Sequence, residues 1–245
     1  MRCCPHPDRR PNLQLVESNL FGLRAACYRL GHATSTVEFV VCPMIHIGTQ
    51  AYYDSVRAVL DECDEVIFEG LRSFRTRLIT ASYRWLTHRR RLALVTQSQA
   101  LRMDQQSARL VPADVSGSEF ADDWRQIAWH HRLALLTAAP AYGLWLYLTA
   151  TRASIGKRQG VDDLRSRNDI LRDELVPGFD AAIFDRRDER LIAAIEAARA
   201  RSGSGRKVAI VYGAAHMRAA LEHLMSRHGY RVADSRWLTV MDYDS

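Results

Sequence analysis

Three ionisable residues each stand at or just past the end of an apolar run in the sequence. His46 follows "VEFVVC", Glu69 follows "EVIF", and His216 follows "VAIVYG". Short apolar runs rich in β-branched residues predict buried β-strands. If these strands are parallel neighbours, the three side chains meet at the carboxyl edge of one sheet, which is where open α/β sheets bind ligands.

Two imidazoles and a carboxylate at one edge suit two kinds of chemistry. His46, Glu69 and His216 could ligate a divalent metal such as Mn, Co or Zn and leave positions open for water. They could also work without metal, with a histidine as general base oriented by Glu69. Taken alone, His46 is also typical of a capping or packing histidine, and His216 of a hydrogen-bonding residue in a helix's first turn. The repeated strand-end position favours a functional site.

Arg187 is the fourth candidate. The apolar stripe of a predicted helix starts at Leu191, and Arg187, one turn earlier, continues that stripe toward the core. A buried charge needs a partner, and Glu69, a substrate carboxylate or a developing oxyanion would serve. The alternative is an exposed arginine in the Arg-rich segment "DRRDER". The candidate catalytic residues are therefore Glu69, Arg187, His46 and His216.

The elements that must position these residues follow an α/β pattern. Strand, helix and strand patterns follow one another over residues 36–69, the size of a βαβ crossover. "NLQLVES" and "GLRAACYRLG" predict an antiparallel hairpin, and "YRVADSRWLTV" predicts an edge strand at the end. Together they predict an α/β domain over residues 13–245, with a central mixed, largely parallel sheet flanked by helices. Residues 1–12 are expected to form a flexible tail.

The middle of the chain has a helical and partly apolar character. Residues 73–101 predict a cationic helix. Residues 133–150 carry no charge and are just long enough to be considered as a membrane span. Pro140 and Gly143 interrupt them, which predicts two helices that meet near Pro140 and form an apolar hairpin over the site. Contact with a membrane surface, or a span, is the alternative.

Composition narrows the class of partner. The 245 residues are 47% hydrophobic with a net charge of +6, which is ordinary for a globular protein. No nucleic-acid-binding motif is present, so we expect no nucleic-acid partner. "MRCCPHPDRRPN" lacks the apolar core of a secretory signal, and the five cysteines include no CxxC pair. We therefore expect a cytoplasmic protein with reduced thiols; Cys3, Cys4 and His6 are a further candidate metal set.

Together the motifs resemble the TraB/Tiki/GumN (PrgY) superfamily, which has the erythromycin-esterase-like and ChaN-like fold. The family carries two Gly-x-x-His motifs, a glutamate after the strand that follows the first motif, and an Arg-Asn/Asp pair that opens a late helix. The second motif is Gly213-Ala214-Ala215-His216 here. The first is Pro43-Met44-Ile45-His46, with Pro43 where the family has glycine. Glu69 and Arg187-Asp188 match the remaining positions.

The resemblance implies a single domain built from two duplicated halves, with a helical insert at about 73–178 between them. Tiki proteins are described as metal-dependent proteases, while other relatives are tied to peptide pheromones or bind haem. It therefore implies a metal-dependent hydrolase, a Tiki-like peptidase or related amide or ester hydrolase, acting on a small peptide or another hydrophobic small molecule. The alternative is a non-catalytic protein that binds or sequesters a peptide signal, haem or another ligand on the same fold.

Overall fold

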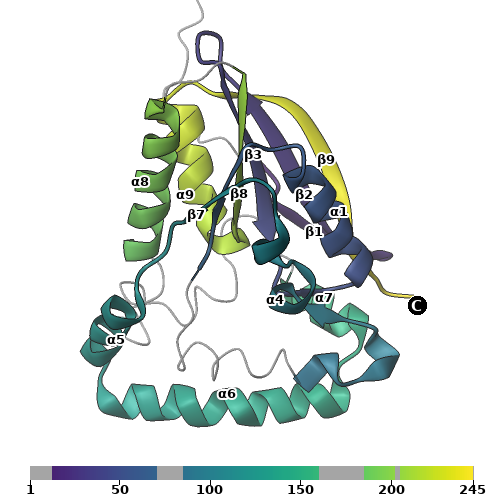
Figure 1. Cartoon of the computed structure of the whole chain (residues 1–245). Helices are drawn as coiled ribbons and strands as arrows, with labels where there is room; N and C mark the ends of the chain where they lie inside the picture. The colour runs from purple at the N-terminus through teal and green to yellow at the C-terminus, as the bar shows by residue number, and fades with distance from the viewer. Residues whose placement is uncertain (1–12, 71–84, 160–184, 202–204, 245) are drawn as a thin grey trace, which may run out of the picture.

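The computed structural model of the chain describes residues 13–70, 85–159, 185–201 and 205–244 (Figure 1). The predicted tail, with its Cys3, Cys4 and His6 set, lies outside these residues. Within them the chain forms an α/β structure with a mixed, largely parallel seven-stranded sheet flanked by helices, as the sequence predicts. The division into two duplicated halves and the single-domain boundary stay predictions.

The sheet runs in the order β1-β2-β3-β8-β5-β7, and β9 pairs with the other side of β2. Its strands are β1 (Val16–Ser18), β2 (Gly22–Gly31), β3 (Val37–Met44), β5 (Glu65–Phe68), β7 (Arg109–Pro112), β8 (Arg206–Gly213) and β9 (Arg231–Asp242). β3, β8, β5 and β7 are parallel to one another. In register, Met44 lies beside Gly213 and Phe68 beside Pro112, so the four parallel strands end at one edge.

Helices cover both faces of this sheet. Figure 1 shows α1 on one side and α8 with α9 on the other. The helices are α1 (Gln50–Leu60), α4 (Gln97–Ala100), α5 (Gly117–Gln126), α6 (Trp129–Thr149), α7 (Arg152–Gln159), α8 (Arg186–Ala200) and α9 (Met217–Glu222). Short 3-10 turns are η1 (Arg90–Leu92), η2 (Met103–Gln105) and η5 (Ala214–His216), and η6 (His223–Arg227) is a π-turn. A separate ribbon pairs β4 (Ile47–Gly48) with β6 (Val95–Thr96).

The predicted hairpin and crossover are both present. β1 and β2 pair antiparallel, and β3–α1–β5 makes a parallel crossover with β8 placed between its two strands. Thr49 begins α1 because its hydroxyl accepts the backbone N–H of Tyr52 at 3.3 Å. Tyr52, Tyr53 and Val56 then face the core with no more than 1% of their surface exposed. Apolar burial of this kind fixes the crossover against the sheet.

Residues 73–101 do not form one helix where the structure describes them. η1 ends at Ala93, which has a left-handed backbone with φ of +46°, and β6 and α4 follow. The helix prediction was wrong here because Leu92 and Leu94 turn into the core and Thr96 starts a new capped turn. The range 73–178 that the sequence assigns to a helical insert also supplies strand β7 to the main sheet.

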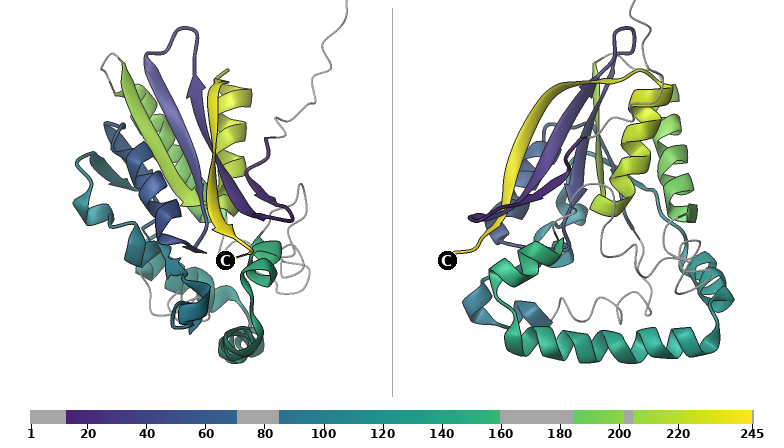
Figure 2. Two further views of the ribbon diagram at one scale, coloured as in Figure 1. Left: turned by 90° about the vertical axis from the view of Figure 1, so that its right-hand side faces the viewer. Right: turned by 180° about the vertical axis from the view of Figure 1, so that it is seen from behind.

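The apolar segment 133–150 is not a hairpin. It lies in α6, which continues through Pro140 as one helix. A proline removes one helical hydrogen bond, and the Leu- and Ala-rich turns on both sides keep the rest. Figures 1 and 2 show α6 running across the end of the sheet where the parallel strands stop. No helix among the described residues has both the length and the apolar character needed to cross a membrane.

Candidate functional site

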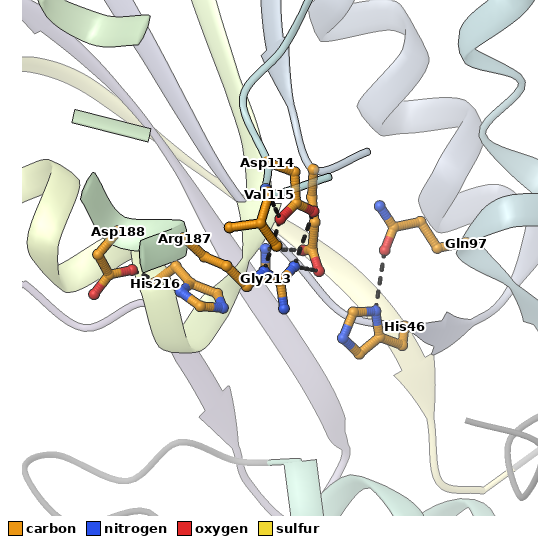
Figure 3. Close-up of polar contacts among 9 residues, drawn as sticks. His46, Gln97, Asp114, Val115, Arg187, Asp188, Gly213 and His216 are labelled. Atoms are coloured by element: carbon orange, nitrogen blue, oxygen red, sulfur yellow. Dashed lines mark hydrogen bonds and ion pairs between the residues drawn. The ribbon is translucent and has the colours of Figure 1, made fainter. Parts of the chain in front are cut away.

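The three strand-end side chains meet beside Gly213, the last residue of β8. A Cβ atom at that position would lie 3.2 Å from Glu69 Oε2, 3.7 Å from His216 Cδ2 and 4.0 Å from His46 Nε2. The glycine therefore leaves room for the carboxylate, whose Oε2 accepts the Gly213 backbone N–H at 2.9 Å. Figure 3 shows His46 and His216 on opposite flanks of Arg187. The parallel register of β3, β8 and β5 produces this convergence.

Arg187 lies between two carboxylates. Its Nη2 donates to Glu69 Oε1. Its Nε and Nη2 donate to the two oxygens of Asp114 at 2.9 and 3.2 Å (Figure 3). Arg187 is 8% exposed and the Asp114 side chain 3% exposed. A guanidinium held by one buried and one partly buried carboxylate has a fixed position, because each hydrogen bond is charge-assisted.

Asp114 is a site residue that the sequence analysis missed. It lies two residues after β7, as His46 lies two residues after β3. β7 is a short, partly exposed edge strand of sequence "RLVP", which has a weak strand pattern. The signal that could have found Asp114 is its position past a fourth parallel strand.

The charges around Glu69 keep it ionised. Burial by itself would raise the pKa of Glu69, but the charges of Arg187, His46 and His216 and the Arg187 hydrogen bond outweigh burial and lower the pKa to about 2. Burial would lower the pKa of Arg187, but the charge of Glu69 outweighs it and holds that pKa above its ordinary value. Glu69 is therefore a permanent anion near neutral pH and a poor proton acceptor.

His216 is held at one ring nitrogen. Its Nδ1 donates to Asp188 Oδ1 at 2.6 Å, and its ring packs edge-on against Tyr212 with 5.0 Å between centroids. The residue is 4% exposed. Because Asp188 fixes the proton on Nδ1, neutral His216 presents the Nε2 lone pair. The Tyr212 side chain is fully buried.

His46 is also held at Nδ1 but lies in the open. Its Nδ1 lies 3.2 Å from Gln97 Oε1, and its backbone C=O accepts the Gln97 N–H at 3.0 Å. The β4–β6 ribbon brings these residues together although they are 51 positions apart. The His46 side chain is solvent-exposed. The His46 atom that lies close to the Gly213 position is Nε2, and the corresponding His216 atom is the ring carbon Cδ2.

The predicted metal ligands do not form a closed three-ligand group. No choice of one ligand atom from each of His46, Glu69 and His216 brings all three within 4.8 Å of one another. Within the described ranges such a group does occur elsewhere, and it consists of Glu196, His223 and His228. The sequence analysis missed this second group, because the spacing of its histidines fits no regular α-helical face.

Comparisons with known proteins give no match: no family model, no curated protein and no solved structure is similar to the chain. The resemblance to the TraB/Tiki/GumN superfamily therefore stays a prediction.

Proposed function

We propose that the protein is a hydrolase that cleaves an amide or ester bond in a small peptide or another hydrophobic small molecule. The observation that supports this is the convergence of His46, Glu69 and His216 around the end of β8. Both imidazoles are held through Nδ1, which directs their Nε2 atoms to the reacting group. The likeness to the TraB/Tiki/GumN motifs points to the same class of reaction.

His216 is the general base in this proposal. Asp188 orients its ring and stabilises the imidazolium that forms, as a carboxylate does for a catalytic histidine in other hydrolases. Nε2 takes a proton from water while the water oxygen bonds to the substrate carbonyl carbon. The proton then passes to the leaving nitrogen or oxygen as the carbon–heteroatom bond breaks. His46, on the exposed side, is placed to assist the leaving group.

Arg187 provides positive charge for the oxyanion. Asp114 and Glu69 use its Nε and Nη2, so Nη1 is the donor for a substrate oxygen. The two carboxylates hold the guanidinium in place before substrate binds, and a donor of fixed position stabilises the developing charge without reorganisation.

A divalent metal, Mn, Co or Zn, fits the donor set in part. Metal-ligating histidines ordinarily have their other ring nitrogen held by a carboxylate or carbonyl oxygen, as His46 and His216 do. With Glu69 they would hold the ion only if the exposed His46 side chain moved toward the other two, and His216 would then be a metal ligand in place of the base. When bound, the metal would lower the pKa of a water ligand and polarise the carbonyl.

The test is a substrate screen with metal as a variable. The full chain is freed of metal with a chelator and assayed with and without Mn²⁺, Co²⁺ or Zn²⁺ on nitrophenyl esters of graded acyl length and on dye-labelled short peptides. We expect turnover that His216→Ala and His46→Ala each reduce by about 10²-fold or more. No turnover of any substrate, or equal turnover by the folded variants, would overturn the proposal.

A second candidate function is binding without turnover, and α6 favours it. This helix exposes seven large apolar side chains. They are Trp129, Leu133, Tyr142, Leu144, Trp145, Tyr147 and Leu148. The helix itself runs across the end of the sheet that carries the site (Figure 2). A peptide signal, haem or another hydrophobic ligand could lie against such a surface. Saturable binding of haem or an apolar peptide, unaffected by His216→Ala and without turnover, would favour this second function.

A further inference from the structure

A second cluster of metal-ligand side chains lies away from the site described above. Glu196 is on α8, nine residues beyond Arg187, which is about 13 Å along the helix. His223 begins the π-turn η6, and His228 directly follows that turn. Arg187 lies in the first turn of α8, and His216 ends η5 directly before α9. The cluster therefore joins the later parts of the same two helical segments.

The three ligand atoms face one another at short range. His228 Nε2 lies 2.6 Å from Glu196 Oε1 and 3.3 Å from His223 Nε2, and His223 Nε2 also contacts Glu196 Oε1. The two rings are edge-on, with 4.8 Å between centroids. Two nitrogens bound to one tetrahedral zinc ion lie about 3.4 Å apart, given bonds of about 2.1 Å. The separation of the imidazole nitrogens already matches that geometry.

The π-turn explains how two histidines five residues apart share one face. In an α-helix, five residues turn the chain about 500°, which leaves the two side chains about 140° apart. In a π-turn each residue pairs with the fifth residue along, so His223 and His228 become neighbours. Gly229, with φ of +73°, then turns the chain out of the helix directly after His228. Such π-turns are rare and are frequent at functional sites.

The polar contacts of the cluster converge on a few shared atoms. His228 Nε2 lies within hydrogen-bond distance of Glu196 Oε1, of His223 Nε2 and of Arg199 Nη1, the last at 3.1 Å. One ring nitrogen either donates or accepts, so it cannot satisfy both a carboxylate oxygen and a guanidinium N–H. A cation in place of the shared protons would let both nitrogens and the carboxylate oxygen act as lone-pair donors.

We propose that Glu196, His223 and His228 form a binding site for a divalent transition metal of the zinc class. Two imidazoles and one carboxylate are ligands that Zn²⁺, Co²⁺ and Ni²⁺ accept, and they leave a fourth position for water. Arg199 Nη1 holds the other Glu196 oxygen at 2.8 Å, as hydrogen-bonded partners hold ligating carboxylates. The ion joins α8 to the segment after α9, and thereby steadies the helix whose first turn carries Arg187 and the helix that directly follows His216.

The experiment measures metal binding and thermal stability, so it does not depend on any activity. Metal-free full-length protein is titrated with Zn²⁺ against a competing chelating dye, and with Co²⁺, whose visible absorption reports tetrahedral nitrogen and oxygen ligands. The variants are His228→Gln and Glu196→Gln, whose side chains are 24% and 42% exposed and tolerate replacement. Circular dichroism verifies their fold. His130→Gln, on α6, is the control, and His46→Ala/His216→Ala removes the two candidate histidine ligands beside β8.

We expect the wild-type protein, the control and the His46→Ala/His216→Ala protein each to bind one Zn²⁺ at this site and to gain thermal stability from it. His228→Gln and Glu196→Gln should each weaken that binding by more than about tenfold and abolish the gain. Absence of binding in the wild-type protein, or binding that both variants retain, would overturn the proposal. Loss of all metal in the His46→Ala/His216→Ala protein alone would place the metal at the other site and would also overturn it.

Discussion

Arg187 and Asp188 are consecutive residues that hold two different parts of the candidate site. Arg187 bonds to Glu69 and Asp114 at the ends of β5 and β7, whereas Asp188 bonds to His216 beyond the end of β8. Neighbouring helix positions point about 100° apart, which lets the first turn of α8 reach both groups. The position of this one turn therefore sets the spacing between His216 and the two carboxylates, Glu69 and Asp114.

Asp188→Asn should reduce hydrolysis while leaving the fold intact. The amide keeps the size of the carboxylate but removes the charge that stabilises an imidazolium at His216. We expect kcat to fall by about 10²-fold or more, with little change in KM. Glu189→Gln, an exposed residue of the same helical turn, is the matched control and should leave kcat unchanged. If the Asp188→Asn protein has the wild-type kcat, His216 is not the general base.

Because of Glu69, the free energy of unfolding should fall as the pH is lowered into the acid range. Its pKa is about 2 in the folded protein and ordinarily 4.5. The folded state therefore favours the ionised form, and this contribution is present above pH 4.5 and disappears as pH falls toward 2. The difference corresponds to about 3 kcal/mol of unfolding free energy at neutral pH.

Urea unfolding of wild type and Glu69→Gln between pH 3 and pH 7 measures this contribution. Because glutamine does not titrate, we expect wild type to be the more stable protein at pH 7 and its advantage to shrink toward pH 3. A constant difference across that range would contradict the low pKa of Glu69.

Arg187→Met should destabilise the protein strongly, because it removes the guanidinium from the buried Asp114 carboxylate and the partly buried Glu69 carboxylate. Removing one partner of a buried ion pair costs about 3–5 kcal/mol. In the Arg187→Met protein, Glu69→Gln should lower the free energy of unfolding by less than it does in the wild-type protein, because it removes one of the unpaired charges. Arg190→Met, which breaks an exposed pair with Glu119, should cost less than about 1 kcal/mol.

Chemical denaturation of the four proteins in this double-mutant cycle measures the coupling directly. Strictly additive costs for Arg187→Met and Glu69→Gln would contradict the contact between the two side chains.

The buried part of the sheet could be predicted from the sequence, and its edges could not. β3 and β8 are apolar along nearly their whole length because both faces are covered. β7 is half-exposed and ends in Pro112, so its four residues carry no clear strand pattern. Its pairing with β5 is a contact between segments distant in the sequence, which the sequence of β7 alone does not predict. At Pro140 the local pattern was misleading: the sequence predicted a break in the helix, but α6 continues. A single proline is tolerated there because strong helix formers flank it.

The candidate site could be assembled from strand ends, but its supporting contacts could not. His46, Glu69 and His216 follow apolar runs, and the parallel register brings them together. Gln97 supports His46 through the β4–β6 ribbon, in a range where the sequence predicts a continuous helix. The metal cluster proposed on α8 and η6 needs a π-turn at His223, a geometry that helical periodicity does not anticipate.

Gly213→Ala tests whether the space beside the end of β8 is the active site. Gly213 has φ of −53° and ψ of 139°, which any residue adopts, so alanine causes no backbone strain. Its Cβ would instead crowd Glu69 Oε2 at 3.2 Å and approach His216 Cδ2 at 3.7 Å. We expect a loss of about 1 kcal/mol in stability, and a fall in kcat/KM of about tenfold or more because small displacements at a reacting centre are costly.

Gly117→Ala is the matched control for Gly213→Ala, since a Cβ at residue 117 meets nothing within 4 Å. Gly117 opens α5 on the surface, so its replacement should change the unfolding free energy by less than about 0.5 kcal/mol and leave hydrolysis at the wild-type rate. Urea unfolding and steady-state kinetics of both variants decide the matter. If Gly213→Ala is as active as Gly117→Ala, the carboxylate and imidazoles around β8 are packing groups, and the reaction belongs elsewhere on the molecule.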